Sequence, residues 1–362
     1  MRGLYRLVLL ILVLASAGLT YRSAATLAAN PALVPLIERS ADEIAALTDR
    51  MVAKDATPER LAALLATRLA EDPRNWVALQ AIADLYAERG LALPDSYAAA
   101  WDAESGLLAQ TGDCLSCAWD IGTCSLSTAL LCKAPILLTP VEDLRGITKA
   151  GVDYASGTEV DRLDLGLSVV GLSATVLIAA SGGTSATVKA GTALVRLARG
   201  MRLLTPKLTA RLAGAFTDGI RWADLPAVRS LDDLPRLLRT DALAPVAATF
   251  ADLGRTRDVL GTSQTLHLLP LIDDAADARA LARTSEALGL RTVSRLELIG
   301  KTRVFRATLR LSNASLELAT GFFGLIAAMG AAIAHLVQTI AFRALRGGNR
   351  QRPSRPTPRQ RR

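Results

Sequence analysis

The chain has 362 residues, of which 51% are hydrophobic and only 4% aromatic, and its mean hydropathy is +0.29. This composition excludes intrinsic disorder, and the predominance of Ala and Leu predicts an all-α protein in contact with a membrane. The net charge of +8 arises in residues 343–362, which contain eight arginines and no acidic residue. A nucleic-acid partner is therefore not predicted, because no basic patch on a folded face accompanies this tail.

The first 21 residues, 1–21, have the features of an export signal. Arg2 and Arg6 precede an uncharged run from Leu7 to Tyr21, in which the small residues Ala15-Ser16-Ala17 follow the most apolar part. That pattern is typical of a bacterial signal peptide. The alternative is an uncleaved signal anchor whose flanking arginines reach the membrane surface.

A second apolar segment, residues 318–342, contains no formal charge and is followed directly by Arg343. As a helix it would be about 37 Å long, enough to cross a bilayer. We therefore predict a transmembrane helix here and a disordered basic tail at 343–362. Because arginine-rich ends stay in the cytoplasm, the tail is predicted to be cytoplasmic and residues 22 to 318 to lie in the periplasm, outside a bacterial inner membrane.

One face of this predicted transmembrane helix carries Gly324, Ala328, Ala331 and His335. Small residues let a second helix approach closely, and an imidazole inside a membrane needs a hydrogen-bond partner. The face is therefore predicted to bind another membrane or envelope protein, or a second copy of the chain. The alternative is that its small residues only reflect an alanine-rich composition.

Residues 22–110 are predicted to form a helical domain. Ser40-Ala41-Asp42-Glu43 has the form of a capping box and predicts the start of a helix. A leucine stripe predicts a helix that ends at Asp72-Pro73. Another helix is expected from about Asn75 to Arg89, with Gly90 in the place of a left-handed cap.

The helix from Asn75 resembles the first helix of a tetratricopeptide-type pair. The residues at the corresponding offsets are Pro73, Leu79, Ile82, Ala83, Tyr86 and Gly90. The resemblance covers about residues 59–101 and weakens in the next helix, where Pro94-Asp95-Ser96 replaces a small residue. No period of about 34 residues continues downstream. The resemblance implies a helical pair that packs or binds a partner, and an ordinary helical hairpin would explain the same stripe.

All four cysteines lie within residues 111–140: Cys114, Cys117, Cys124 and Cys132. Three interpretations compete, namely two structural disulfides, a redox pair at Cys114 and Cys117, and a zinc site. Export favours the disulfides, with the connectivity open. Cys117 and Cys124 would be about 10 Å apart along one helix, so a bridge between them requires a turn at Gly122.

Residues 141–204 combine an apolar and a basic helix. Leu165 to Val188 carries no charge but many Gly, Ser and Thr residues, and is expected to be a buried core helix or a re-entrant hairpin. A single crossing there would place the arginine tail outside, against the positive-inside rule. Ala190 to Leu204 is expected to be an amphipathic helix whose arginines face either solvent or anionic lipid. The layout is similar to the hydrophobic hairpins of membrane-inserting toxins.

Residues 205–317 are predicted to contain short helices separated by prolines (206, 226, 235, 245 and 270), then one extended helical stalk from Asp274. The pairs Asp232-Asp233 and Asp273-Asp274 each stand where a helix begins and are expected to stabilise its N-terminus rather than to act as acid–base groups. His267 is expected to be a hydrogen-bonded core histidine, because no nucleophile motif accompanies it.

These features predict an inner-membrane protein whose extracytoplasmic helical domain acts as a scaffold that binds protein, with membrane lipid as a further partner. No catalytic signature is found, so an enzyme is not predicted, and neither a cofactor nor a metal is expected. One alternative is a pore- or toxin-like protein that inserts the hairpin at 165–204. The other is thiol–disulfide chemistry at Cys114 and Cys117.

Overall fold

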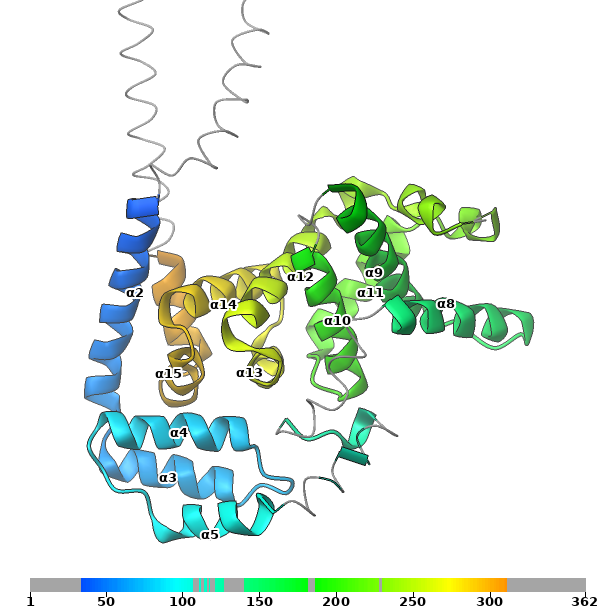
Figure 1. Ribbon diagram of the computed structural model, residues 1–362. Coiled ribbons are helices and arrows are strands. Elements are labelled where there is room, and N and C mark those ends of the chain that lie inside the picture. Colours follow the sequence, from blue (N-terminus) through cyan, green and yellow to red (C-terminus); the bar gives the residue numbers. More distant parts are fainter. Residues whose placement is uncertain are drawn as a thin grey trace, which may run out of the picture. The chain divides into compact units, whose positions relative to one another are not determined.

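The computed structural model describes residues 34–310, apart from gaps at 107–110, 112–113, 116, 118–120, 127–139, 182–185 and 228–229. Within this part of the chain the elements are helical and none is a β-strand, which confirms the predicted all-α class (Figure 1). No helix among the residues described has the length and apolar character that a membrane crossing needs. The predicted export signal at 1–21, the predicted transmembrane helix at 318–342 and the basic tail at 343–362 lie outside the described residues.

The elements are α-helices and short 3-10 helices. In chain order they are α2 (Val34–Asp55), α3 (Pro58–Leu69), α4 (Trp76–Glu88), α5 (Asp95–Glu104), η2 (Ile121–Thr123), α8 (Pro140–Ala155), α9 (Arg162–Ser181), α10 (Ala186–Gly200), α11 (Pro206–Gly219), η4 (Trp222–Ala227), η5 (Leu231–Leu237), α12 (Thr240–Leu260), α13 (Thr262–Leu268), η6 (Leu269–Leu271), α14 (Ala275–Leu288) and α15 (Arg291–Ile299). Residues 301–310 are helical as well.

Side-chain caps explain where several of these helices begin. Thr57 and Thr205 each accept a hydrogen bond from a backbone N–H of the first turn, and each precedes a proline, which fits the first helical position. Asn75 caps α4 in the same way. At the other end of α4, Gly90 has a φ of 65°, which confirms the left-handed cap. These boundaries follow from local sequence.

The predicted helix start at Ser40 is wrong. The helix α2 begins at Val34 and runs through the capping-box motif without a break. The nearest helix breaker, Pro35, is the second residue of α2, where a missing N–H costs no intrahelical hydrogen bond. The motif is therefore interior to a longer helix.

The predicted helical stalk from Asp274 is also wrong. Gly289 and Gly300 have φ values of 58° and 87°, so α14 ends at Leu288 and α15 ends at Ile299. As a result, α14 packs against α2 and α12, and α15 packs against α2 and α4 (Figure 1). Pro245 departs from prediction too, since it lies inside α12 and does not separate two helices.

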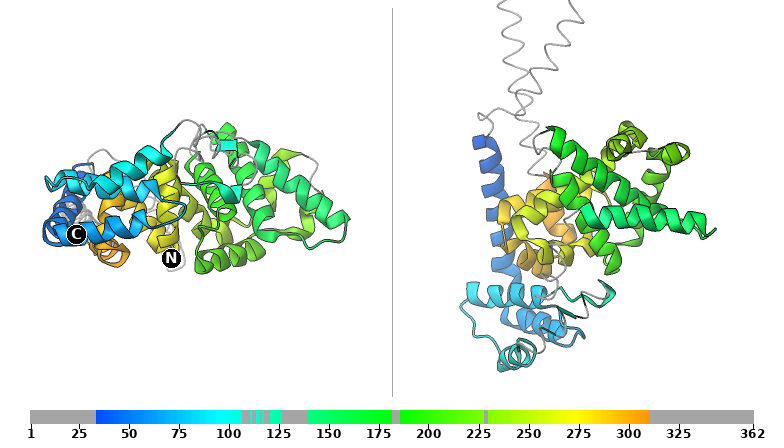
Figure 2. Two further views of the ribbon diagram at one scale, coloured as in Figure 1. Left: turned by 90° about the horizontal axis from the view of Figure 1, so that it is seen from below. Right: turned by 45° about the vertical axis from the view of Figure 1, so that its right-hand side comes forward.

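Two groups of helices share α12. The N-terminal helices α2–α5 lie with α13–α15, whereas α9, α10 and α11 form the other group with η5 (Figures 1 and 2). Glycines bring α10 and α12 into direct backbone contact. A Cβ atom at Gly191 would collide with the carbonyl of Phe250, and one at Gly254 with the carbonyl of Thr187.

The apolar stretch and the basic helix lie in the core of the described chain. In α9, Leu165, Leu167 and Leu172 are buried, and α9 packs against α8, α10 and α11. In α10, Arg199 forms an ion pair with Asp161, and Arg196 donates to the Ser168 hydroxyl at 3.1 Å. The described part of this stretch, residues 165–175, therefore has the burial that a core helix would have.

Candidate functional site

The best-connected polar cluster, which we call the polar junction, comprises Arg68, Asn75, His267 and Glu297. Arg68 donates to both carboxylate oxygens of Glu297 through Nη2, at 2.9 and 2.8 Å. His267 Nε2 lies 2.8 Å from Glu297 Oε1, and Asn75 Nδ2 lies 2.9 Å from His267 Nδ1. The junction thereby links α3 and the start of α4 to α13 and α15, elements about two hundred residues apart in sequence.

The residue that caps α4, Asn75, orients its side chain toward His267. Asn75 Oδ1 accepts from the Ala78 N–H at 3.2 Å, so its amide nitrogen faces the imidazole and Nδ1 must accept. Nε2–H then donates to Glu297, and the His267 side chain is 7% exposed. Both ring nitrogens are occupied, so the ring has no acceptor left for a substrate proton. His267 is therefore a hydrogen-bonded core histidine, as predicted.

The charges of the polar junction compensate each other. Burial alone would raise the pKa of Glu297, but its hydrogen bonds to His267 and Arg68 and the charge of Arg68 outweigh burial and lower that pKa. Burial would lower the pKa of Arg68, and its bonds to Glu297 and Glu71 raise it instead. A buried carboxylate held by a bidentate guanidinium is stable only while both partners are charged.

A second cluster, the arginine junction, comprises Asp49, Glu88 and Arg295. The Arg295 side chain is 2% exposed, and its Nη1 donates to both oxygens of Glu88 at 2.8 Å. Its Nη2 donates to Asp49 at 2.8 Å. The pKa of Arg295, which burial would lower, is raised by these two carboxylates. The junction joins α15 to α2 and α4.

An aromatic surface lies on the same helical group, formed by Trp76, Leu93, Tyr97 and Trp101. The Trp76 ring makes edge contacts with Tyr97 (centroids 5.8 Å apart) and Trp101 (4.9 Å), and its Nε1 donates to Glu104 at 2.7 Å. Trp101 is 43% exposed and Leu93 is exposed as well. No residue of α5 is buried, so these ring contacts attach that helix to α4.

The cysteine segment contains a disulfide between Cys117 and Cys124, whose Cα atoms are 4.4 Å apart. The short helix η2, with Gly122 at its centre, makes the reversal that such a bridge was expected to require. Cys114 is disulfide-bonded too, whereas Cys132 lies outside the described residues. Because Cys117 is bonded to Cys124, the CxxC pair is not the pair that forms. Among the residues described, no group of three potential ligands could hold a metal ion.

The predicted aspartate caps have the expected local role. Asp274 accepts from the N–H groups of Ala276 and Asp277, and Asp233 accepts from the N–H of Ser230. The proposed membrane interface residues Gly324, Ala328, Ala331 and His335 lie outside the described residues.

Sequence reasoning identified His267 but missed Asn75, Glu297 and Arg295. A polar residue in the apolar stripe of α15 was the available signal, since Arg295 and Glu297 lie among Val293, Leu296 and Leu298, all buried.

Comparisons of the chain with protein-family models, curated proteins and solved structures find no match. The expected stripe of α4 is buried, and the main packing partners of α4 are α3 and α15. The tetratricopeptide resemblance thus stays a prediction.

Proposed function

We propose that this protein is a bacterial inner-membrane scaffold whose helical domain is periplasmic and binds a partner protein through the aromatic surface. The observation that carries the proposal is the exposure of Trp101 on α5, a helix with no buried residue, and of Leu93 just before that helix. Trp and Tyr side chains at a surface are the typical anchors of protein interfaces. They offer a large contact area and lose little conformational entropy on binding.

The two junctions support a scaffold because they fix the base of this surface. The polar junction includes Asn75, the residue before Trp76, and the arginine junction includes Glu88 at the end of the same helix. Both ends of α4 are thereby tied to the C-terminal helices. A binding residue on a rigid element loses less entropy when a partner docks.

The ends of the described chain support attachment to one membrane. Arg303 forms an ion pair with Asp55, so the helix at 301–310 begins beside the last residue of α2. The first turn of α2 and the end of that helix lie on the same side of the helical group (Figure 1). A domain held at both ends by one bilayer requires this arrangement. The disulfide between Cys117 and Cys124 supports an oxidising compartment.

The predicted membrane interface is a second proposed contact. We expect the face formed by Gly324, Ala328, Ala331 and His335 to associate with another membrane helix. Replacing Gly324 and Ala328 by isoleucine should weaken that association without changing insertion, as measured by a two-hybrid assay for membrane helices. Unchanged association would contradict it.

The test of the binding surface is site-specific photocrosslinking of the full-length protein in bacterial membranes. A p-benzoylphenylalanine at position 101 should give a discrete protein adduct that Leu93→Glu removes. The same amino acid at position 290 is the matched control, because Leu290 is also exposed but belongs to the turn before α15. Identical adducts at the two positions, or none at 101, would contradict the proposal.

Topology is tested separately. Alkaline phosphatase fused at Thr205 should be active and fused after Arg362 inactive, because the tail arginines keep that end in the cytoplasm. The reverse activity at either position would overturn the periplasmic location. Leakage of liposomes caused by the protein would favour insertion of the 165–204 hairpin instead, although such insertion would have to expose the buried face of α9.

A further inference from the structure

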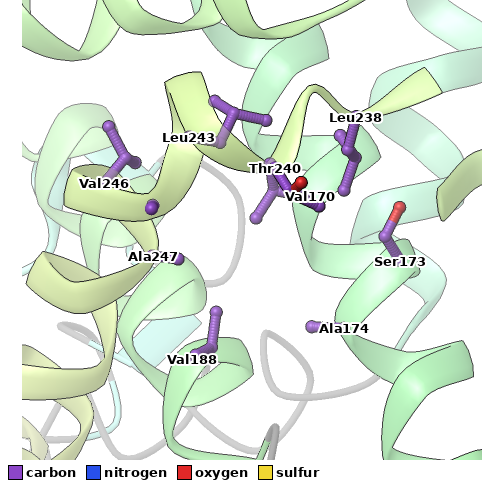
Figure 3. A pocket seen from close by; sticks show the side chains of 10 residues that line it. Val170, Ser173, Ala174, Val188, Leu238, Thr240, Leu243, Val246 and Ala247 are labelled. Carbon is purple, nitrogen blue, oxygen red and sulfur yellow. The ribbon is translucent and has the colours of Figure 1, made fainter. Parts of the chain in front are cut away.

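Two apolar features of the described structure differ in the charge around them. The first is a cavity of about 300 Å³ between α9 and α12, whose wall includes Val170, Leu243 and Ala247 and contains no charged residue (Figure 3). Nothing in that wall selects an occupant. The second is the aromatic surface, which is bordered by carboxylates. Its charge therefore indicates the chemistry of the group that it binds.

The stretch that forms the aromatic surface is acidic, although the whole chain has a net charge of +8. Residues 76–106 contain five acidic residues and one basic residue. Two of the acids are compensated, because Glu88 pairs with Arg295 and Glu104 pairs with Arg74. The other three are exposed and form no ion pair within the described part of the chain, namely Asp84, Asp95 and Asp102.

Two of these uncompensated carboxylates belong to the surroundings of the rings. Asp102 follows Trp101 directly in α5. The pKa of the Tyr97 hydroxyl is raised, first by burial and then by the negative charge of Asp84, so that charge reaches the ring. The one base of the stretch, Arg89, is the C-terminal cap of α4. It lies about 20 Å along that helix from the tryptophan at the other end, too far to neutralise the surface there.

Exposed indole beside unpaired carboxylate is a suitable site for a cation. Trp101 is 43% exposed, and its ring plane stands at 82° to that of Trp76, so this edge contact covers at most one face of Trp101. A guanidinium or ammonium group is attracted to the face of an aromatic ring, and tryptophan attracts it most strongly. A carboxylate next to the ring can pair with the same cation, whereas an acidic partner would be repelled.

We propose that the aromatic surface binds a basic segment of the partner protein, with an arginine or lysine side chain on the ring of Trp101 and paired with a neighbouring aspartate. The inference rests on the proposed function, because it specifies the chemistry of the partner which that function requires. It also opposes a membrane surface as the occupant. Anionic lipid headgroups attract basic side chains and would be repelled by Asp84, Asp95 and Asp102.

The test places p-benzoylphenylalanine at position 98 of the full-length protein in bacterial membranes. Ala98 is exposed about one turn before Trp101, so the ring itself stays intact. Asp84→Asn combined with Asp102→Asn should lower the yield of the protein adduct about fivefold, because both attractions to the basic segment are lost. Asp241→Asn is the matched control and should leave the yield unchanged. Asp241 is also exposed and without an ion pair in the described chain, but it belongs to the first turn of α12.

Mass spectrometry of the adduct formed with both aspartates intact keeps the test decisive if the double substitution disturbs the fold. The cross-linked partner peptide should contain more basic than acidic residues. An adduct whose yield does not depend on the two aspartates, or a partner peptide rich in acidic residues, would overturn this inference and leave the proposed protein-binding function standing. A cross-link to the chain's own residues 343–362 would overturn the inference as well. The absence of any adduct, or a cross-link to lipid alone, would overturn both.

Discussion

Two interfaces of this molecule are held together by different forces. The contact of α15 with α2, α3 and α4 contains two largely buried charges with more exposed partners, Arg295 with Asp49 and Glu88, and Glu297 with Arg68. The contact of α10 with α12 is apolar and depends on Gly191 and Gly254. Charged groups fix which surfaces meet, because an unpaired buried charge is very unfavourable. The glycine contacts instead require that the two helix backbones approach closely, because a Cβ atom at Gly191 or Gly254 would collide with the opposing carbonyl.

The largest effect should come from breaking the charged interface. Arg295→Ala removes a buried side chain and leaves the Glu88 carboxylate without its guanidinium partner, and should lower the free energy of unfolding by about 3 kcal/mol. Arg291→Ala is the matched control. Arg291 contacts the same Asp49 from an exposed position, so its loss should cost less than about 1 kcal/mol. Thermal unfolding of the purified full-length protein measures the stability of both variants. Equal losses of stability would show that the burial of Arg295 does not strengthen its ion pairs.

A smaller effect is expected at the glycine interface. Gly254→Ala places a methyl group against the Thr187 carbonyl and should destabilise the protein by about 2 kcal/mol. Gly214→Ala is the control in α11, where a Cβ atom would meet nothing within 4 Å. There the better helix former should stabilise by about 1 kcal/mol. The free energy of unfolding should therefore fall in Gly254→Ala and rise in Gly214→Ala. A destabilised Gly214→Ala would contradict the explanation by backbone contact.

The smallest expected effect is on the pH dependence of stability, which should differ between the two interfaces. The pKa of Glu297 is lowered in the folded state from about 4.5, so its stabilising contribution is complete above that value. It is lost as the pH falls further, through the folded-state pKa. In Glu297→Gln the free energy of unfolding should therefore fall less steeply as the pH is lowered. Gly254→Ala should lower the free energy of unfolding equally at every pH and leave the slope against pH unchanged. An unchanged slope in Glu297→Gln would show that the junction does not titrate as described.

Local sequence predicted a large part of the helices and little of the candidate site. The ends of α4 and the cap at Asp274 depend on residues within one turn, and these predictions were correct. The single stalk from Asp274 failed because Gly289 and Gly300 were treated as interruptions of one helix. Whether a glycine bends a helix or ends it depends on what the next helix can pack against, here α2 and α4.

The sequence by itself determined the helical class, the local caps and the need for a turn at Gly122, because each depends on backbone hydrogen bonds between near neighbours. Only the tertiary structure decided that Cys117 pairs with Cys124, that Arg295 meets Asp49, and that Asn75 meets His267. Arg295 and Asp49 are 246 residues apart in the chain. No local pattern in the sequence identifies such a partner. The pairing is favoured by the free energy that a buried charge gains from an opposite charge, and Arg295 becomes buried only when the helices pack together.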